Sequence, residues 1–362
     1  MLNYIKNVLE NMPKDWLNLT THRLDIYNEE LAKTDFLNQF EELFKKNNSE
    51  ISALTNLPTA YDYIRLGHPL SCVLEWAIAN LNNTKAENVI SFSSKTIPIL
   101  AILRTNLLEN KKTQILYTDE LPSFFDAKII REIYGYNFEM QKIDAINSVP
   151  KFEGSTIFIS STKNIFSFDD QKAIDFFINL NADLGNILFI NGKENEQYIS
   201  DIQHLRRRET IAMTPSNSLL ALQSLVNHNA IDTPKIDALN NKKNVLESIK
   251  EITGTTINPL VASSGLSIQY AIMMGLIHDA QENYPEKALK FIVPPNCYGG
   301  TNDQARRVAA CLKNVEIVDL PVDGNNDMVQ SIETVLTKIA TEDAVPFIIA
   351  EIPTNPRVEV PN

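Results

Sequence analysis

From about residue 57 to the end of the sequence, short apolar runs alternate with segments whose apolar residues recur every three or four positions. Short apolar runs bounded by polar turns predict buried strands, and the segments between them predict helices. The predicted strands are residues 88–92, 114–117, 155–160, 187–191, 210–213, 260–262, 290–293, 315–319 and 346–350. The predicted helices include residues 168–180, 267–280, 302–312 and 327–340. Strands that alternate with helices predict a layered α/β fold with a mostly parallel sheet.

The first 55 residues have a different pattern. Apolar residues at helical spacing among charged ones predict a helix over residues 29–46, and no strand is expected before residue 57. The polar stretch 227–243 is the best candidate for a boundary farther along the chain. We therefore expect an N-terminal helical segment over residues 1–56, a domain over 57–232 and a further domain over 233–362.

Composition narrows the class of protein. A chain of 362 residues that is 44% apolar and 22% charged can bury a large core in two domains. The net charge of −12 argues against a general nucleic-acid surface. Cys72, Cys297 and Cys311 have no disulfide or metal-ligand spacing, which predicts a reduced, cytoplasmic location and no metal site. No apolar run approaches ~18 residues, so we expect no membrane span.

Three motifs combine residue types suited to binding a ligand. Ser264, Gly265 and Leu266 open a predicted helix after a predicted strand, where free backbone N–H groups attract a phosphate and glycine lets it approach. Tyr298 precedes two glycines and offers a flat ring with a polar tip. Glu351 follows an apolar strand in the run E-I-P-T-N-P, which includes Asn355, and ligands of parallel sheets gather at strand ends.

The ordered set S-S-G-L, Y-G-G-T and E-x-P-T-N-P resembles the Cys/Met-metabolism family of pyridoxal-phosphate (PLP) enzymes, which includes cystathionine γ-synthase and its lyase relatives. The resemblance implies the three-layer, mostly parallel sheet of the PLP-dependent transferase (aspartate aminotransferase-like) major domain. It implies that Ser264, Gly265 and Leu266 bind the cofactor phosphate. It also implies that Tyr298 stacks on the pyridine ring, that Asn355 bonds the phenolic oxygen and that Glu351 belongs to the same site.

A weaker copy of the motifs precedes these. Tyr63-Ile64-Arg65-Leu66-Gly67-His68-Pro69 resembles the opening Y-x-R-x-G-N-P of the family, with His68 in place of asparagine, where we expect turn geometry. The domain over 57–232 is then a degenerate PLP-transferase-like copy, and 233–362 is the N-terminal part of a second copy with better-preserved motifs. In the family the Y-x-R reaches the phosphate of the neighbouring subunit. Tyr63 and Arg65 are therefore expected to complete the site, in a homodimer or in a pseudo-dimer within one chain.

The resemblance also locates what the sequence lacks. In the family the Schiff-base lysine follows P-T-N-P by some 50 residues, so it is expected beyond Asn362, and no catalytic residue is assigned within this chain. Lys163 follows a serine and a threonine but precedes the strand that the family lysine follows, so its assignment is weak. The implied function is a PLP-dependent lyase or transferase of sulfur amino-acid metabolism, by β/γ-elimination or γ-replacement on an amino-acid substrate, represented here by a fragment. The alternatives are a non-catalytic PLP-fold structural or regulatory protein, and an unrelated α/β nucleotide- or sugar-binding protein.

Overall fold

The chain packs as two compact units. The computed structural model describes residues 1–18, 29–60, 65–121, 125–146, 149–161, 173–181, 183–228, 237–321, 327–355 and 358–360, without the side chains of 29–32. The first unit is Met1–Phe125 with Asn137–Leu260, and the second is Val261–Asn362 with the excursion Asp126–Tyr136. The domains predicted over 57–232 and 233–362 were defined as two tandem copies of one fold, and that division stays a prediction.

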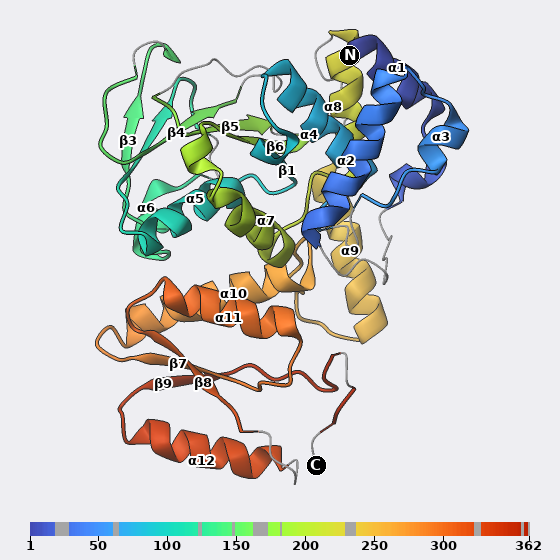
Figure 1. The fold of residues 1–362 in the computed structure, drawn as a ribbon. Helices are drawn as coiled ribbons and strands as arrows, with labels where there is room; N and C mark the ends of the chain where they lie inside the picture. The colour runs from blue at the N-terminus through green and yellow to red at the C-terminus, as the bar shows by residue number, and fades with distance from the viewer. Residues whose placement is uncertain are drawn as a thin grey trace. The chain divides into compact units, whose positions relative to one another are not determined.

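The first unit is built on a six-stranded sheet with the order β1-β6-β5-β4-β2-β3 (Figure 1). Only β6 runs antiparallel to its neighbours β1 and β5, so this sheet is mostly parallel, as predicted. Its strands are β1 (Val89–Phe92), β2 (Thr113–Tyr117), β3 (Glu139–Lys142), β4 (Ser155–Ser160), β5 (Phe176–Asn181) and β6 (Gly185–Ile190). The α/β class predicted from the sequence is thereby confirmed.

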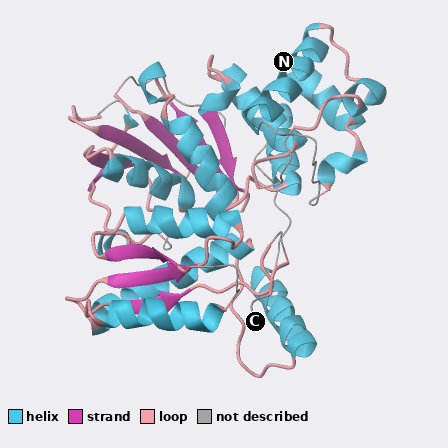
Figure 2. Ribbon diagram, turned by 60° about the horizontal axis from the view of Figure 1, so that its bottom comes forward, coloured by secondary structure: helices cyan, strands magenta, loops and turns pink. Residues whose placement is uncertain are grey.

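Helices flank this sheet, and Figure 2 shows the strands side by side with helices packed around them. The N-terminal helices are α1 (Leu2–Asn11), α2 (Glu29–Lys45) and α3 (Ile51–Thr55), with the 3-10 turn η1 (Lys14–Leu17). The others are α4 (Pro69–Leu81), η2 (Ala86–Asn88), α5 (Ile97–Leu108), η4 (Lys193–Asn195), α7 (Tyr198–Glu209), α8 (Pro215–Asn227) and α9 (Ala238–Thr253). The helix predicted over 29–46 is confirmed as α2.

Three predicted elements are wrong. The helix predicted over 168–180 is β5 from Phe176 onward, and residues 168–172 lie outside the described part. Because β5 is buried on both faces, its apolar run lacks the alternation that marks a half-buried strand. The segments 210–213 and 260–262 form no strand. The amide of Ala212 instead donates to the carbonyl of Arg65 at 2.9 Å, so this apolar segment bonds to a loop.

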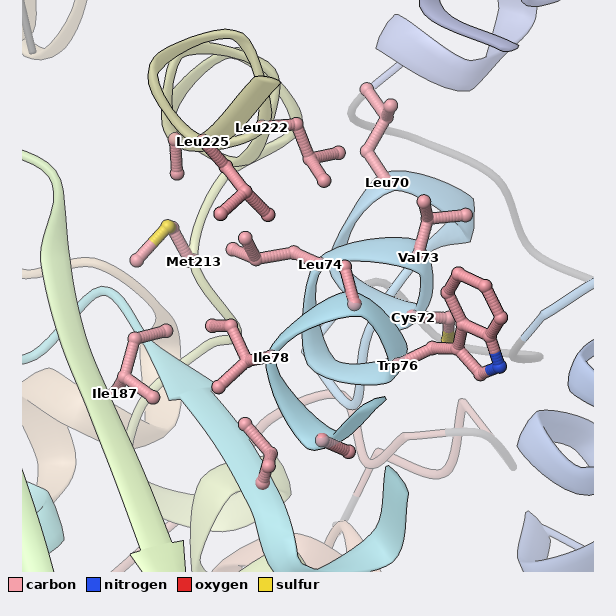
Figure 3. Packing of buried hydrophobic residues seen from close by; sticks show 14 of the residues in the cluster. Leu70, Cys72, Val73, Leu74, Trp76, Ile78, Ile187, Met213, Leu222 and Leu225 are labelled. Carbon is pink, nitrogen blue, oxygen red and sulfur yellow. The ribbon is translucent and has the colours of Figure 1, made fainter. Parts of the chain in front are cut away.

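Helix α4 lies at the centre of the first unit's core. Ten consecutive residues from Leu70 to Ala79 are buried, so the helix is packed on all sides. Its side chains face strands, α8 and the N-terminal helices (Figure 3). Leu74 and Ile78 lie beside Met213 and Ile187, while Trp76 points away from these residues. The N-terminal helices share this core through Tyr4, Ile5, Val8, Phe36 and Phe40.

His68 fixes the start of α4. Its Nδ1 accepts the backbone N–H of Ser71 at 3.2 Å, and its Nε2 lies 2.7 Å from the carbonyl of Met213. Ser71 Oγ in turn accepts the N–H of His68, which completes a capping box, and Pro69 suits the first helical position. The turn role expected for His68 is therefore confirmed. Burial lowers the pKa of His68 to about 4, against smaller opposing effects of the Met213 bond and Glu75.

A buried carboxylate joins four elements of the first unit. Glu75 on α4 pairs with Lys33 of α2 at 2.7 Å and with Arg206 of α7 at 2.9 Å, and it accepts both the N–H and the hydroxyl of Ser91 on β1. Burial opposes ionisation of Glu75. The charges of Lys33 and Arg206 outweigh that effect and lower the pKa of Glu75 to about 2.

The second unit holds a three-stranded sheet, β8-β7-β9, in which all neighbours are parallel. Its strands β7 (Leu289–Val293), β8 (Val315–Asp319) and β9 (Val345–Ile348) confirm three predicted strands. Helices α10 (Gly265–Asn283) and α11 (Gly299–Ala310) lie on one face and α12 (Met328–Ala340) on the other (Figure 1), and all three were predicted. The excursion contributes α6 (Ala127–Glu132), and Tyr134 beside it packs on Tyr270 of α10.

Within the part of the chain that the structure describes, no helix has both the length and the apolar character needed to cross a membrane. In the same residues, no group of three or more histidine, cysteine or acidic side chains is placed to hold a metal ion.

Replacing Glu75 should destabilise the first unit strongly. Glu75→Ala leaves the Lys33 and Arg206 charges buried without a counter-ion, which should cost about 3–5 kcal/mol of unfolding free energy. Both tryptophans, Trp16 and Trp76, are buried in this unit, so urea unfolding followed by tryptophan fluorescence reports on it. The matched control is Glu196→Ala, which breaks a largely exposed pair with Lys85 and should cost about 1 kcal/mol or less. Equal losses in the two variants would contradict the prediction.

Acid should weaken the first unit through His68. The folded-state pKa of about 4 lies below the ordinary value of 6.5, so the unfolded chain binds a proton more readily between these values. Stability is therefore fully present above pH 6.5 and falls as the pH drops toward 4, by roughly 2 kcal/mol between pH 7 and 4.5. His68→Asn keeps a side-chain cap but does not titrate. The fall in unfolding free energy of this variant between pH 7 and 4.5 should therefore be smaller than that of the wild type by roughly 2 kcal/mol. If urea unfolding gave the same dependence of stability on pH for the wild type and His68→Asn, His68 would not be the cause of the acid destabilisation.

Candidate functional site

The parallel sheet of the second unit brings two of the predicted motifs to one edge. Strand β7 ends at Val293 and leads through residues 294–298 into α11, while β9 ends at Ile348 and leads to Glu351. The N–H of Ile349 donates to the carbonyl of Ile292 at 3.0 Å, which carries the strand pairing past the end of β9. The carboxyl ends of both strands therefore meet, as expected for parallel neighbours.

A hydrogen bond joins these two motifs directly. The backbone N–H of Tyr298, the N-cap residue of α11, donates to Glu351 Oε2 at 2.9 Å. The carboxylate lies at the positive end of the helix dipole, where a negative charge is stabilised. Burial, together with the charge of Glu351, raises the pKa of the neighbouring Cys297 thiol. Cys297 is thus kept as a neutral thiol at this edge.

The third motif opens α10. Ser264 is the N-cap residue, and its Oγ accepts the N–H of Ser267 at 3.1 Å. Among the described residues, the N–H groups of Gly265 and Leu266 have no acceptor, as is usual in a first helical turn. A Cβ placed on Gly265 would meet no atom within 4 Å. Two free donors, open space and a helix dipole therefore coincide at this terminus, which suits an anion such as phosphate.

Two glutamine side chains hold the starts of α10 and α11 together. Gln304 is fully buried in α11 and donates through Nε2 to the carbonyl of Leu266 at 2.9 Å. Gln269 of α10 accepts the hydroxyl of Thr301 at 3.1 Å. The S-S-G-L turn is thereby joined to the Y-G-G-T turn, and through Tyr298 to Glu351. Five predicted residues, Ser264, Gly265, Leu266, Tyr298 and Glu351, thus form one connected cluster.

Asn355 and the Y-x-R motif are not part of this cluster in the described structure. Asn355 is exposed and has no hydrogen bond to another described residue. Tyr63 lies outside the described residues. Arg65 is buried in the first unit with 5% of its surface exposed. The predicted contacts of Tyr63, Arg65 and Asn355 with a cofactor stay predictions.

The start of α5 in the first unit lacks the free donors that an anion needs. The hydroxyl of Ser94 accepts the N–H groups of Thr96 and Ile97 at 3.4 and 3.2 Å. Pro98, in the first turn of α5, has no N–H at all. The donors that Gly265 and Leu266 leave free in α10 are therefore used or absent in α5.

No lysine of the described second unit lies at the motif edge. Lys287 precedes β7 and pairs with Asp343, and Lys313 precedes β8. Lys290 occupies the second position of β7 and pairs with Glu342 and Glu316. The hydrogen bond that Lys290 donates to Glu342, partly opposed by burial, raises the pKa of Lys290 and keeps it a protonated, poor nucleophile. Lys163 lies outside the described residues.

Sequence reasoning missed Gln304, Gln269 and Glu359 of this site. A glutamine inside the apolar stripe of α11 was a usable signal, because a buried amide needs a partner. Glu359 had no such signal, because its partner, Asn296, is 63 residues away.

The first unit also contains a cleft of about 650 Å³ between α2, η2 and α7. Its cations Lys33 and Lys85 are already paired with Glu75 and Glu196. Leu66 of the segment Tyr63–Pro69 lines this cleft, but none of the predicted cofactor-binding residues does, so the candidate site remains the α10–α11 edge of the second unit.

No family model matches the chain, and no curated protein matches it. Similar solved structures include an O-acetylhomoserine (thiol)-lyase from Campylobacter jejuni that carries a pyridoxyl-lysine monophosphate, at 12% identity and a TM-score of 0.32 over 74% of this chain and 81% of that one. Cystathionine γ-lyase from yeast is 13% identical, with a TM-score of 0.37 over 68% of each chain.

A third is cystathionine γ-synthase from Xanthomonas oryzae in complex with aminoacrylate and cysteine. It is 14% identical, with a TM-score of 0.33 over 56% of this chain and 60% of that one.

Proposed function

We propose that the second unit binds pyridoxal phosphate, with the cofactor phosphate at the amino terminus of α10. The observation that supports this most directly is the connected cluster of S-S-G-L, Y-G-G-T and Glu351 at one sheet edge. The N–H groups of Gly265 and Leu266 and the hydroxyl of Ser264 would bind the phosphate. The open space at Gly265 fits this role.

The leading function is that of a PLP-dependent lyase or transferase of sulfur amino-acid metabolism. When bound, this cofactor withdraws electrons from the α-carbon of an amino acid and so permits elimination or replacement at its β- or γ-carbon. The substrate class rests on the order of the three motifs in the sequence. The residues of this chain would bind the phosphate and contact the ring through Tyr298, with Tyr63, Arg65 and Asn355 as further contacts. A second copy or the first unit would supply Tyr63 and Arg65, in a cytoplasmic homodimer or pseudo-dimer.

A second candidate is a non-catalytic PLP-fold protein with a structural or regulatory role. One observation favours it: in the described second unit, no lysine lies at the motif edge, and Lys290 is committed to an ion-pair cluster. The cofactor's phosphate therefore fits the described residues, but its covalent attachment has no residue there to make it. The two candidates differ in whether a lysine outside the described part completes the site.

Adding a negative charge at Gly265 should abolish most of the binding of pyridoxamine 5′-phosphate. In Gly265→Asp the new side chain has room, and an acidic residue suits a first helical turn, so α10 should fold. Its carboxylate would occupy the phosphate position, and we expect binding to weaken about tenfold or more. Pyridoxamine 5′-phosphate suits the titration because, lacking an aldehyde, it cannot react with surface lysines.

The matched control is Gly275→Asp, which adds the same charge to the same helix at another open position. This variant should bind pyridoxamine 5′-phosphate with the affinity of the wild type. Equal weakening in both variants would point to a general charge effect, and no binding by the wild type would reject the proposed function.

Covalent trapping separates the two candidates. The chain should leave no single lysine labelled at full stoichiometry after treatment with pyridoxal phosphate and borohydride, because Lys290 is kept protonated and Lys287 is paired with Asp343. Peptide mass spectrometry measures the label at each lysine. One lysine labelled completely would contradict this expectation and favour the catalytic candidate, and Lys163 would be the first to check.

A further inference from the structure

We propose that Glu351 and Glu359 are positioning residues that orient Tyr298 toward a ligand bound at the amino terminus of α10. This inference rests on the proposed function, which places the phosphate at Gly265 and the ring beside Tyr298. It concerns two carboxylates that contact the loop before Tyr298 and not the ligand itself.

Both carboxylates hold the loop that follows β7. Glu351 Oε2 accepts the backbone N–H of Tyr298 at 2.9 Å, and Glu359 Oε2 accepts Asn296 Nδ2 at 2.7 Å. The loop thus has two anchors, one at each side of Cys297. The loop ends at the start of α11, where the N–H of Thr301 donates to the carbonyl of Tyr298 at 2.8 Å.

The segment that carries the two carboxylates is itself held in shape by Thr354. Thr354 is buried, its N–H donates to the carbonyl of Glu359 at 3.0 Å, and its hydroxyl accepts the N–H of Glu359 at 3.0 Å. The N–H of Val358 donates to the carbonyl of Thr354 at 2.8 Å. These bonds bring Glu351 and Glu359 to the same loop although they are eight positions apart in the sequence.

The charge of Glu351 also separates the two helix termini. Because its carboxylate already lies at the start of α11, a second anion there would be repelled. The start of α10 has no such carboxylate bonded to it among the described residues, and Ser264 there is neutral. A ligand with one anionic end should therefore place that end at α10 and its ring toward Tyr298. The bond between Gln304 and Leu266 keeps the two termini at a fixed separation.

The test compares a ligand with a ring and one without it. Binding of pyridoxamine 5′-phosphate and of inorganic phosphate is measured by calorimetry on the full chain, for the wild type, Glu351→Ala, Glu351→Gln and Glu359→Ala. Loss of the hydrogen bond to the Tyr298 N–H in Glu351→Ala should weaken binding of the ring-bearing ligand about tenfold, and loss of the bond to Asn296 in Glu359→Ala should weaken it in the same direction. The affinity of the start of α10 for inorganic phosphate should not change, because Glu351 does not contact that terminus. Glu351→Gln keeps an acceptor oxygen for the Tyr298 N–H and should recover most of the affinity.

The control is Glu333→Ala, an exposed glutamate on α12 across the sheet, which should change neither affinity. Hydrogen exchange at the Tyr298 amide reports the contact without any ligand, and it should accelerate in Glu351→Ala but not in Glu333→Ala.

Unchanged binding of the ring-bearing ligand by Glu351→Ala would overturn the inference. An equal loss for both ligands would also overturn it, as the mark of a merely structural role. If the wild type binds inorganic phosphate but gains nothing from the ring, the positioning role fails while the phosphate site stands. If it binds neither, the proposed function itself fails.

Discussion

The candidate site depends on the parallel course of β7 and β9. In a parallel pair both carboxyl ends lie at the same edge, so the residues that follow them are brought together whatever their distance along the chain. Tyr298 and Glu351 are 53 positions apart, yet they share a hydrogen bond because each follows one of these strands. Had β9 run antiparallel, Glu351 would lie at the opposite edge of the sheet, beside the ion pairs of Lys290 and Lys287. The connection between Y-G-G-T and E-x-P-T-N-P is thus a consequence of topology.

Two glutamates show how partners decide what a carboxylate does. Glu75 is fully buried between Lys33 and Arg206, and these cations outweigh the cost of its burial, so it joins helices to strand β1. Glu351 is only half-buried and, within the described residues, bonds a backbone N–H and pairs with no cation. A carboxylate bound to cations fixes a core. One bound to the start of a helix fixes a loop and leaves its charge near the site, where it can direct a ligand.

The sequence predicted most of this edge, because the chemistry there is local. Apolar runs gave β7, β8 and β9, and the positions of Tyr298 and Glu351 beyond the ends of β7 and β9 followed from them. Ser264 was placed correctly at the start of a helix, although the strand predicted before it, 260–262, does not form. What failed depends on tertiary contacts. Strand β5 was misassigned because burial on both faces removes the period of two, and 210–213 bonds to Arg65 instead of pairing in the sheet. The bond between Gln304 and Leu266 needs the packing of α10 on α11, which no spacing in the sequence encodes.

The difference between α5 and α10 gives the strongest reason to place the ligand in the second unit. Both helices follow a Ser-Ser pair, and both have a serine hydroxyl at their start. In α5 that hydroxyl takes up the N–H groups of Thr96 and Ile97, and Pro98 removes another donor. In α10 the hydroxyl of Ser264 reaches past Gly265 and Leu266 to Ser267, so these two donors have no acceptor among the described residues, and a Cβ at Gly265 would meet open space. A small change in which amide the serine caps therefore separates a closed helix start from one that can receive a phosphate.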